Sequence, residues 1–457
     1  MSQPRSDALV VFGATGDLAG KMIFPAVCAL AARGAFDIPL IAIARHDVDA
    51  LRTAVTSHLD ACTPARRKLD RDLARRIRYV AGDLGDAATY AKLKRALRDA
   101  RHPLHYLAIP PALFPAVVAG LSESGLAAGA RIAVEKPFGH DLASARALDK
   151  TLRNAFADSA IFRIDHFLAK DPVRDLVFLR FGNRWLEPIW NRTSIARIEI
   201  TMAETFAIAG RGRFYDAVGA LRDVFQNHLL QIVALLTMGP PARPTRRAIH
   251  AARVAALTAL RPLAPNDIVR GRFKGYREVE DVARDSHTET YVAVRVRSRA
   301  LRWKNVPICV RAGKCLPVTS TEIWIAFKPL AFPVAPNTGT AAGHLRFRLG
   351  PGRIDIGLGA YVKRRGAAMV GDFVELRADL GIDEDRDAYE RLIEAALAGD
   401  HALSESAEGA YASWRVVERV VKSNLPVFEY APATWGPAEG NRILPRGVRW
   451  HDPTPNA

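Results

Sequence analysis

A glycine-rich segment between two apolar runs constrains this sequence more than any other feature. Residues 7–12 form a short apolar run that predicts a buried parallel strand, and G-A-T-G-D-L-A-G (13–20) follows at once. A helical pattern then continues to Arg33, and a second apolar run over 39–44 ends at Arg45. Strand, glycine loop, helix and strand in this order predict a right-handed βαβ unit.

The glycine segment favours a dinucleotide site. Its glycines let the backbone approach a pyrophosphate, and the start of the following helix offers N–H groups and partial positive charge. The spacing G-x-x-G-x-x-x-G differs from the commoner G-x-G-x-x-G, so as an isolated motif it also fits a structural tight turn. Its position between a strand and a helix favours the dinucleotide site.

The end of the second apolar run bears on which cofactor binds. NAD enzymes usually place an acidic residue there to hold the ribose 2′-hydroxyl. This chain has Arg45 and then His46, with Asp47 one step later. Because a guanidinium would pair with a 2′-phosphate, we expect NADP, and Asp47 keeps NAD as the weaker alternative.

Helix and strand patterns alternate up to about residue 175. They predict a Rossmann-type doubly wound parallel sheet, with an NADP-binding domain over 1–175. Strand-like runs lie at 76–83, 104–111 and 131–139. The last run carries Glu135 and Lys136 at its carboxyl end, where ligands of open α/β sheets bind. We expect Lys136 to bridge cofactor and substrate; a simple Glu135–Lys136 salt bridge is the alternative.

Beyond about residue 176 the pattern changes to alternating strands with little room for helices between them. They predict a larger α+β domain over 176–457, built on a mostly antiparallel sheet. The expected strands lie at 197–204, 290–297, 307–314, 322–328, 345–349 and 353–358. A Pro/Gly/Thr-rich loop is expected at 329–343.

One long helical pattern, 220–238, interrupts these strands. It is mostly apolar, yet it carries Asp223, Asn227, His228 and Gln231 within roughly 140° of an α-helical wheel. Burying that many polar groups without a purpose is costly, so the pattern favours a functional stripe. His228 taken alone would also fit a hydrogen-bonded core histidine.

The segment 163–172, R-I-D-H-F-L-A-K-D-P, concentrates charge. Asp165, His166 and Lys170 stand within six positions. A carboxylate, an imidazole and an ammonium this close predict a proton relay beside an anion site. A solvated helix start with incidental charges is the alternative.

Bulk properties exclude several classes of protein. No apolar run approaches the roughly 20 residues needed to cross a bilayer, and the N-terminus lacks a signal-peptide profile, so we expect a cytoplasmic protein that binds no membrane. The four cysteines are scattered and read as reduced, non-ligand residues. The net charge of +17 is spread along the chain, which favours anionic small molecules over nucleic acid.

Assembled, these segments closely resemble the NADP-linked glucose-6-phosphate dehydrogenase family over nearly the whole chain. The motifs that carry the resemblance are GATGDLAG, YLAIPP, EKPFGHDL, RIDHFLAK, RFGNRWLEPIWNR, FYDAVGALRDVFQNHLLQ and RAGK. The resemblance implies oxidation of D-glucose 6-phosphate to 6-phospho-D-glucono-1,5-lactone, the first step of the oxidative pentose phosphate pathway. It also implies a homodimer or homotetramer assembled through the large sheet. No metal is expected, because the nicotinamide carries the redox chemistry.

The resemblance implies a role for each matching residue. His228 is the general base, and Asp165 accepts a hydrogen bond from it. His166 and Lys170 bind the phosphate, while Glu204 and Asp223 accept hydrogen bonds from sugar hydroxyls. Lys136 and Lys314 lie at the boundary of substrate and cofactor. The NADP site comprises Gly13, Ala14, Thr15, Gly16, Asp17, Leu18 and Arg45.

Three positions depart from the family pattern. Phe167 replaces a common tyrosine, Thr319 replaces a second basic residue, and Phe114 replaces a tyrosine near the cofactor. Two alternatives to the leading function stay open: a paralogue that oxidises another sugar phosphate or free glucose, and a non-catalytic binding paralogue.

Overall fold

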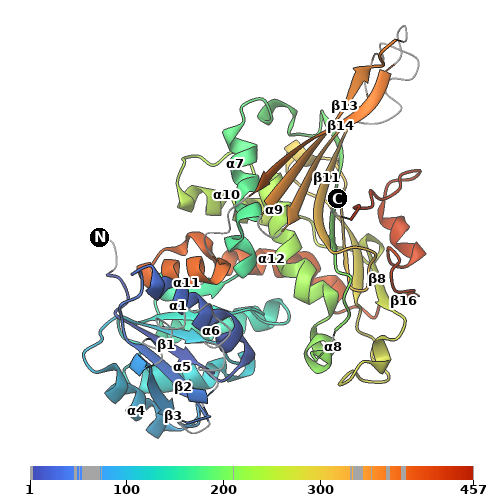
Figure 1. The fold of residues 1–457 in the computed structure, drawn as a ribbon. Helices are drawn as coiled ribbons and strands as arrows, with labels where there is room; N and C mark the ends of the chain where they lie inside the picture. Colours follow the sequence, from blue (N-terminus) through green and yellow to red (C-terminus); the bar gives the residue numbers. More distant parts are fainter. Residues whose placement is uncertain are drawn as a thin grey trace. The chain divides into compact units, whose positions relative to one another are not determined.

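The computed structural model divides the chain into two compact units (Figure 1). The first unit comprises Met1–Lys170 and Glu384–Tyr411, and the second comprises Asp171–Asp383 and Ala412–Ala457. The predicted domain boundary at 175/176 stays a prediction. The residues described are 4–45, 49–50, 52–53, 73, 75–208, 210–329, 332, 343–350, 353–366, 371–381 and 387–455.

The described part of the first unit is organised around a seven-stranded sheet of order β15-β6-β5-β4-β1-β2-β3. β1 to β6 pair in parallel, and β15 joins one edge antiparallel to β6. This is the doubly wound Rossmann order, so the predicted fold is confirmed for this half. The strands are β1 Ala8–Phe12, β2 Leu40–Ala44, β3 Arg78–Ala81, β4 Pro103–Leu107, β5 Arg131–Glu135, β6 Ile161–Ile164 and β15 Ser404–Glu405.

Both faces of this sheet are covered, because alternate residues of β1 enter different cores. Leu9 and Val11 pack in one core with residues of α1 and α11, whereas Val10 and Phe12 pack in the other with residues of α4, α5 and α6. In Figure 1 the orange α11 lies beside the blue α1, although they are far apart in sequence. Among the described residues, the helices of five or more residues that lie in this unit are η1 Ala19–Ile23, α1 Phe24–Ala32, α4 Ala87–Leu97, α5 Phe114–Glu123, α6 Leu142–Ala155 and α11 Ala388–Ala398.

The described part of the second unit is built on a nine-stranded sheet of order β14-β13-β12-β11-β7-β10-β9-β8-β16. All neighbours are antiparallel except β7–β10 and β8–β16, so the predicted mostly antiparallel sheet is confirmed. Most of the predicted loop at 329–343 lies outside the described residues. The strands are β7 Ile195–Ala203, β8 Ile268–Phe273, β9 Tyr291–Val296, β10 Ile308–Gly313, β11 Ser320–Phe327, β12 His344–Gly350, β13 Arg353–Lys363, β14 Gly371–Gly381 and β16 Val427–Tyr430.

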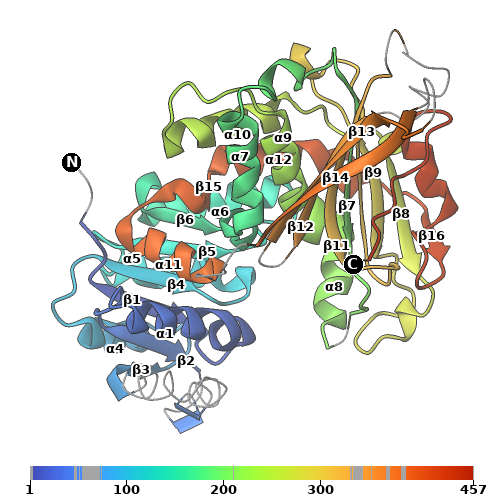
Figure 2. The ribbon, with the colours of Figure 1, turned by 45° about the horizontal axis from the view of Figure 1, so that its top comes forward.

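The long helix expected at 220–238 forms, but in two parts: a π-helix, η6 (Leu221–Leu229), followed by an α-helix, α9 (Leu230–Thr237). Every residue of α9 is buried, and the Trp190 and Trp303 indoles donate hydrogen bonds to its last carbonyls at 2.8 and 2.7 Å. η6 lies against β9 and β10. α9 lies against α7 and α10 (Figure 2). The other helices that lie wholly or largely in this unit are α7 Asp171–Gly182, α8 Gly212–Ala220, α10 Arg246–Ala259 and α12 Ala407–Val421.

Among the described residues, no helix is long and apolar enough to cross a membrane.

Candidate active site

The glycine loop lies at the carboxyl end of β1, as the βαβ prediction required. Gly13 has φ +79°, and a Cβ there would collide with the carbonyl oxygen of Ala108 beyond β4. Gly13 and Ala14 both donate backbone hydrogen bonds of 3.0 Å to Ile43 at the end of β2. Thr15 and Gly16 are exposed, directly ahead of the helical run that starts at Asp17 and includes the π-helix Ala19–Ile23. This cradle, with no room for a side chain at Gly13, fits the pyrophosphate of a dinucleotide.

Asp17 and Leu18 begin the helical run after the glycine loop, and Arg45 follows β2. The Asp17 carboxylate is 89% exposed and pairs with Lys21 at 2.8 Å. Arg45 directly follows β2 and is exposed, so its guanidinium is accessible to a ligand phosphate. His46 and Asp47, whose side chains bear on NAD binding, lie outside the described residues.

Lys136 forms a buried ion pair at the carboxyl ends of β5 and β6. Its ammonium lies 3.0 Å from Asp165 Oδ1, and the side chains are 11% and 3% exposed. The same oxygen accepts a 3.0 Å hydrogen bond from the backbone N–H of Phe167, so Asp165 also caps the 3₁₀ turn η4 (His166–Ala169). The carboxylate is therefore fixed by two donors within its own unit.

A second buried group lies beside this pair. Tyr106, on β4, donates a 2.5 Å hydrogen bond to Glu135 Oε1. Burial raises the pKa of Tyr389, at the start of α11, and the negative charge of Glu135 raises it further. Burial raises the pKa of Glu135 to about 7, although the Tyr106 hydrogen bond and the Lys136 charge act to lower it. We call Tyr106, Glu135, Lys136, Asp165 and Tyr389 the strand-end cluster.

His166 and Lys170 stand at the two ends of η4. The His166 ring stacks on Tyr389, with ring centroids 5.9 Å apart and planes 15° apart. Lys170 is exposed, and its ammonium lies 5.6 Å from the centroid of the buried Phe167 ring. The structure thus brings His166 and Lys170 onto one short turn directly after Asp165, an arrangement suited to holding a phosphate.

The second unit contains a separate group of predicted residues, at the ends of β7 and β10. Lys314 pairs with Glu204 at 2.5 Å, and the side chains are 12% and 30% exposed. The Lys314 ammonium lies 4.9 Å from the Phe206 ring centroid and 5.4 Å from that of Tyr215. We call Glu204, Phe206, Tyr215 and Lys314 the Lys314 cluster.

Asp223 lies close enough to this cluster to act on Tyr215. Burial raises the pKa of Tyr215 well above its ordinary value, and the negative charges of Asp223 and Glu204 raise it further. The negative charges of the two carboxylates expected to bind sugar hydroxyls therefore both act on Tyr215.

His228 follows Asp223 by five positions on η6. The α-helical wheel assumed from the sequence is corrected here: a π-helix has i→i+5 hydrogen bonds, so residues five apart lie closer to one face than in an α-helix. The Asn227 side chain accepts a 2.5 Å hydrogen bond from the His228 backbone N–H and donates one of 3.1 Å to the Arg222 carbonyl. Asp223, Asn227 and His228 are partly buried, whereas Gln231 is 2% exposed and belongs to α9.

The predicted residues thus form two groups, one in each unit. Asp165 and His228 belong to different units, and their pairing stays a prediction. Of the departures from the family pattern, Phe114 is fully buried in a core of the first unit. The Thr319 hydroxyl accepts a 3.1 Å hydrogen bond from the Thr205 backbone N–H, next to Glu204. Among the described residues, no group of three or more His, Cys, Asp or Glu is placed to hold a metal ion.

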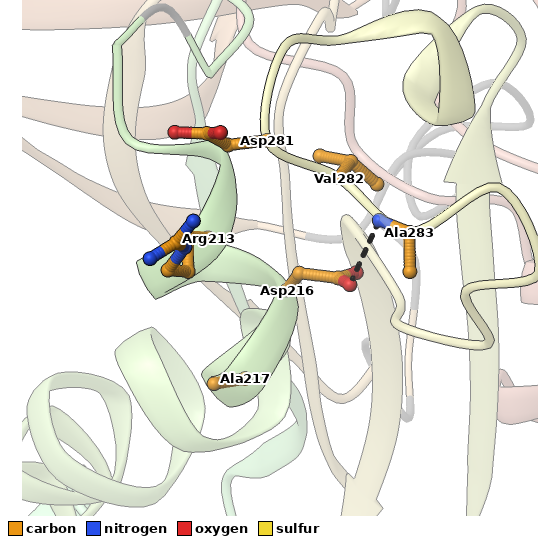
Figure 3. A pocket seen from close by; sticks show the side chains of 6 residues that line it. All are labelled: Arg213, Asp216, Ala217, Asp281, Val282 and Ala283. Carbon is orange, nitrogen blue, oxygen red and sulfur yellow. Dashed lines mark hydrogen bonds between the residues drawn. The ribbon is translucent and has the colours of Figure 1, made fainter.

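A cavity of about 470 Å³ lies elsewhere in the second unit, beside α8 (Figure 3). Asp216 projects toward it and accepts hydrogen bonds from Tyr276 at 2.9 Å and from the Ala283 backbone N–H at 3.3 Å. Because these bonds tie the loop around Asp281 to α8, we assign Asp216 a structural role. The described residues that line the cavity include none of the predicted site residues; they are Arg213, Asp216, Ala217, Asp281, Val282 and Ala283.

Four residues of the two clusters were not predicted from the sequence: Tyr106, Phe206, Tyr215 and Tyr389. Tyr106 and Tyr215 lie inside motifs that carried the family resemblance, so a signal was present. Tyr389 is separated by more than 200 positions from His166, and only the fold brings them together.

Family models, relatives and solved structures all match this chain to the same family over nearly its whole length. Residues 10–175 match the family model for the NAD binding domain of glucose-6-phosphate dehydrogenase, and residues 177–451 match that for its C-terminal domain. Glucose-6-phosphate 1-dehydrogenase 1 of Mycobacterium tuberculosis is 41% identical, over 98% of this chain and 97% of its own length. The Aggregatibacter actinomycetemcomitans glucose-6-phosphate 1-dehydrogenase is 34% identical over 98% of this chain and 97% of its own length.

Two solved structures are similar throughout. The crystal structure of glucose-6-phosphate 1-dehydrogenase from Mycobacterium avium has a TM-score of 0.90 at 38% identity, covering 98% of this chain and 99% of its own. A glucose-6-phosphate dehydrogenase in complex with its substrate glucose-6-phosphate has a TM-score of 0.87 at 30% identity, covering 99% and 100%. By sequence and by structure, this chain belongs to the glucose-6-phosphate dehydrogenase family.

Proposed function

We propose that this protein oxidises D-glucose 6-phosphate to 6-phospho-D-glucono-1,5-lactone with NADP as the hydride acceptor. The observation that carries the proposal is the match to the family over 98% of the chain. Membership makes the protein an oxidoreductase with a nicotinamide cofactor, and it does not favour the paralogue acting on another sugar phosphate or on free glucose. The choice of NADP over NAD is supported by Arg45, exposed directly after β2.

Each half of the site has a part in the proposed reaction. His166 and Lys170 hold the phosphate, while Glu204 and Asp223 accept hydrogen bonds from the sugar hydroxyls. His228 removes the proton of the C1 hydroxyl as the C1–H bond breaks, so that a carbonyl forms at C1. The bound nicotinamide supplies the acceptor for the hydride.

Asp165 and Lys136 have positioning roles in this scheme. Asp165 accepts a hydrogen bond from the His228 ring and stabilises the imidazolium that forms. Lys136, 3.0 Å from Asp165, holds that carboxylate in its orientation. We also propose a cytoplasmic homodimer or homotetramer, assembled through the large sheet of the second unit.

The reaction is tested by following the absorbance of the reduced nicotinamide with glucose 6-phosphate or glucose, each with NADP or NAD. We expect turnover with glucose 6-phosphate and NADP to exceed the other three combinations. Equal turnover of glucose and glucose 6-phosphate would contradict the proposal that His166 and Lys170 bind the phosphate. Equal turnover with NAD and NADP would contradict the proposal that Arg45 selects NADP.

A further inference from the structure

Phe206 is an exposed aromatic side chain at the edge of the proposed sugar site. It is 54% exposed, whereas the other ring of the Lys314 cluster, Tyr215, is 3% exposed. Single exposed apolar side chains are common, but Phe206 lies beside the Lys314–Glu204 pair, so its ring offers an apolar surface next to polar groups.

The backbone holds Phe206 in this exposed position. Glu204 donates to Gly313 at 3.0 Å and accepts from Leu316 at 2.9 Å, and the Phe206 carbonyl accepts from Cys315 at 3.3 Å. The Thr205 backbone N–H donates to the Thr319 hydroxyl at 3.1 Å. Because residues 204, 205 and 206 are all tied to 313–319, the exposure of the ring follows from the fold rather than from a loose loop.

The polar groups beside Phe206 define what kind of ligand suits it. The Lys314 ammonium lies 4.9 Å from its ring centroid and 2.5 Å from the Glu204 carboxylate. An acceptor and a donor thus stand beside an apolar surface. A glucopyranose ring has the complementary pattern, because its hydroxyls project from the rim and its axial C–H bonds cover the two faces.

We propose that Phe206 is a further substrate-contacting residue, whose ring packs against a C–H face of the pyranose while Glu204 and Lys314 bind hydroxyls at its rim. This inference rests on the proposed function and deepens it. It assigns Phe206 to the binding of the sugar itself, separate from the phosphate contacts of His166 and Lys170.

The test compares Phe206→Ala with Phe206→Tyr, which keeps the ring. The matched control is Phe214→Ala, because Phe214 is also exposed (44%) and also has a cation over its ring, Arg211 at 5.4 Å. We measure kcat and KM for glucose 6-phosphate at saturating NADP, KM for NADP at saturating glucose 6-phosphate, and the thermal midpoint of each variant.

We expect Phe206→Ala to lower kcat/KM for glucose 6-phosphate by roughly 5- to 30-fold, the loss that follows from removing one apolar ring contact. Phe206→Tyr and Phe214→Ala should stay within about twofold of the wild type, with KM for NADP and the thermal midpoint unchanged. A Phe206→Ala value equal to that of Phe214→Ala would overturn the inference. So would an increase confined to KM for NADP, which would place the ring against the cofactor.

Two further outcomes separate the inference from other failures. If Phe206→Ala unfolds, Phe206→Leu decides, because it keeps apolar bulk without a flat ring: an unchanged kcat/KM there overturns the stacking contact, and a loss supports it. Absence of wild-type turnover with glucose 6-phosphate would overturn the proposed function. A normal wild type with unaffected Phe206 variants would overturn the inference alone.

Discussion

The strand-end cluster of the first unit and the Lys314 cluster of the second differ in how far their groups are shielded from solvent. Lys136 and Asp165 have side chains 11% and 3% exposed, whereas Glu204 in the other cluster has a side chain 30% exposed and Phe206 is 54% exposed. Both clusters contain a lysine–carboxylate pair with an equally shielded lysine, but the carboxylate and the exposed phenyl ring of the second cluster are more accessible to solvent. We therefore expect a ligand to reach Glu204 and Phe206 more readily than Asp165.

The cause lies in the two sheets. The first cluster stands at the ends of parallel strands buried on both faces, where every polar group needs a partner. Asp165 and Glu135 meet that need with backbone, tyrosine and lysine donors. The second cluster stands where β7 and β10 end at a loop surface, so its groups are accessible to sugar hydroxyls.

The largest effect is expected from His228→Asn, which removes the proposed base from the second unit and leaves the strand-end cluster intact. We expect kcat to fall by roughly 10²- to 10⁴-fold with KM for glucose 6-phosphate little changed, because the phosphate contacts remain. Steady-state kinetics would measure this, with the exposed His287→Asn as control. Activity near the wild-type value would exclude His228 as the base.

Lys170→Ala should instead weaken substrate binding, because it removes one of the two side chains proposed to bind the phosphate. Losing one charge-assisted hydrogen bond corresponds to about a 10- to 100-fold rise in KM for glucose 6-phosphate. Lys150→Ala, also exposed and in the same unit, is the control and should leave KM unchanged. A KM matching the control would show that the first unit does not bind the phosphate through Lys170.

Arg45→Ala tests the cofactor end of the first unit. Because Arg45 is exposed, we expect a smaller effect: roughly a tenfold loss in the ratio of kcat/KM with NADP to that with NAD. Arg101→Ala, before the first residue of β4, provides an exposed arginine away from the carboxyl strand ends. If the ratio changes equally in both variants, the assignment of Arg45 to the 2′-phosphate is wrong.

Glu135→Gln tests whether the strand-end cluster is shielded from water. With a folded pKa of about 7 against about 4.3 when unfolded, Glu135 keeps a proton in the folded state that the unfolded state has lost. Its contribution to stability therefore decreases as pH rises from about 4.5 to 7, by up to about 3 kcal/mol. The amide does not titrate, so the thermal midpoint of the variant relative to wild type should rise across this window.

The control for that experiment is Glu123→Gln, an exposed carboxylate near the end of α5. Its difference from wild type should stay flat with pH. A flat difference for Glu135→Gln as well would mean that Glu135 ionises normally and that the cluster is open to water.

The site residues of the first unit were easier to predict from the sequence than those of the second. The glycine loop, Arg45, Lys136 and Asp165 all follow short apolar strands, and period and position along the chain suffice to place them at the same edge of a sheet. The tyrosines that contact Glu135 and His166 were not predictable in this way, because Tyr106 and Tyr389 come from other elements.

In the second unit, local pattern was a weaker guide. The apolar residues of 221–229 fit a helix, but nothing in their spacing distinguishes a π-helix from an α-helix, so the relation of Asp223 to His228 had to come from the structure. The exposure of Phe206 depends on backbone hydrogen bonds to residues 313–319, more than 100 positions away. Contacts of that range leave no local signature.

The discontinuity of the first unit has a consequence for how the protein is made. β15 and α11 belong to this unit, yet they are synthesised only after the chain has passed through most of the second. Until residue 398 has left the ribosome, the face of the nucleotide-binding sheet that α1 covers lacks α11, and His166 lacks Tyr389. The nascent first unit therefore cannot complete its core until this helix is synthesised, more than 200 codons downstream of its last parallel strand.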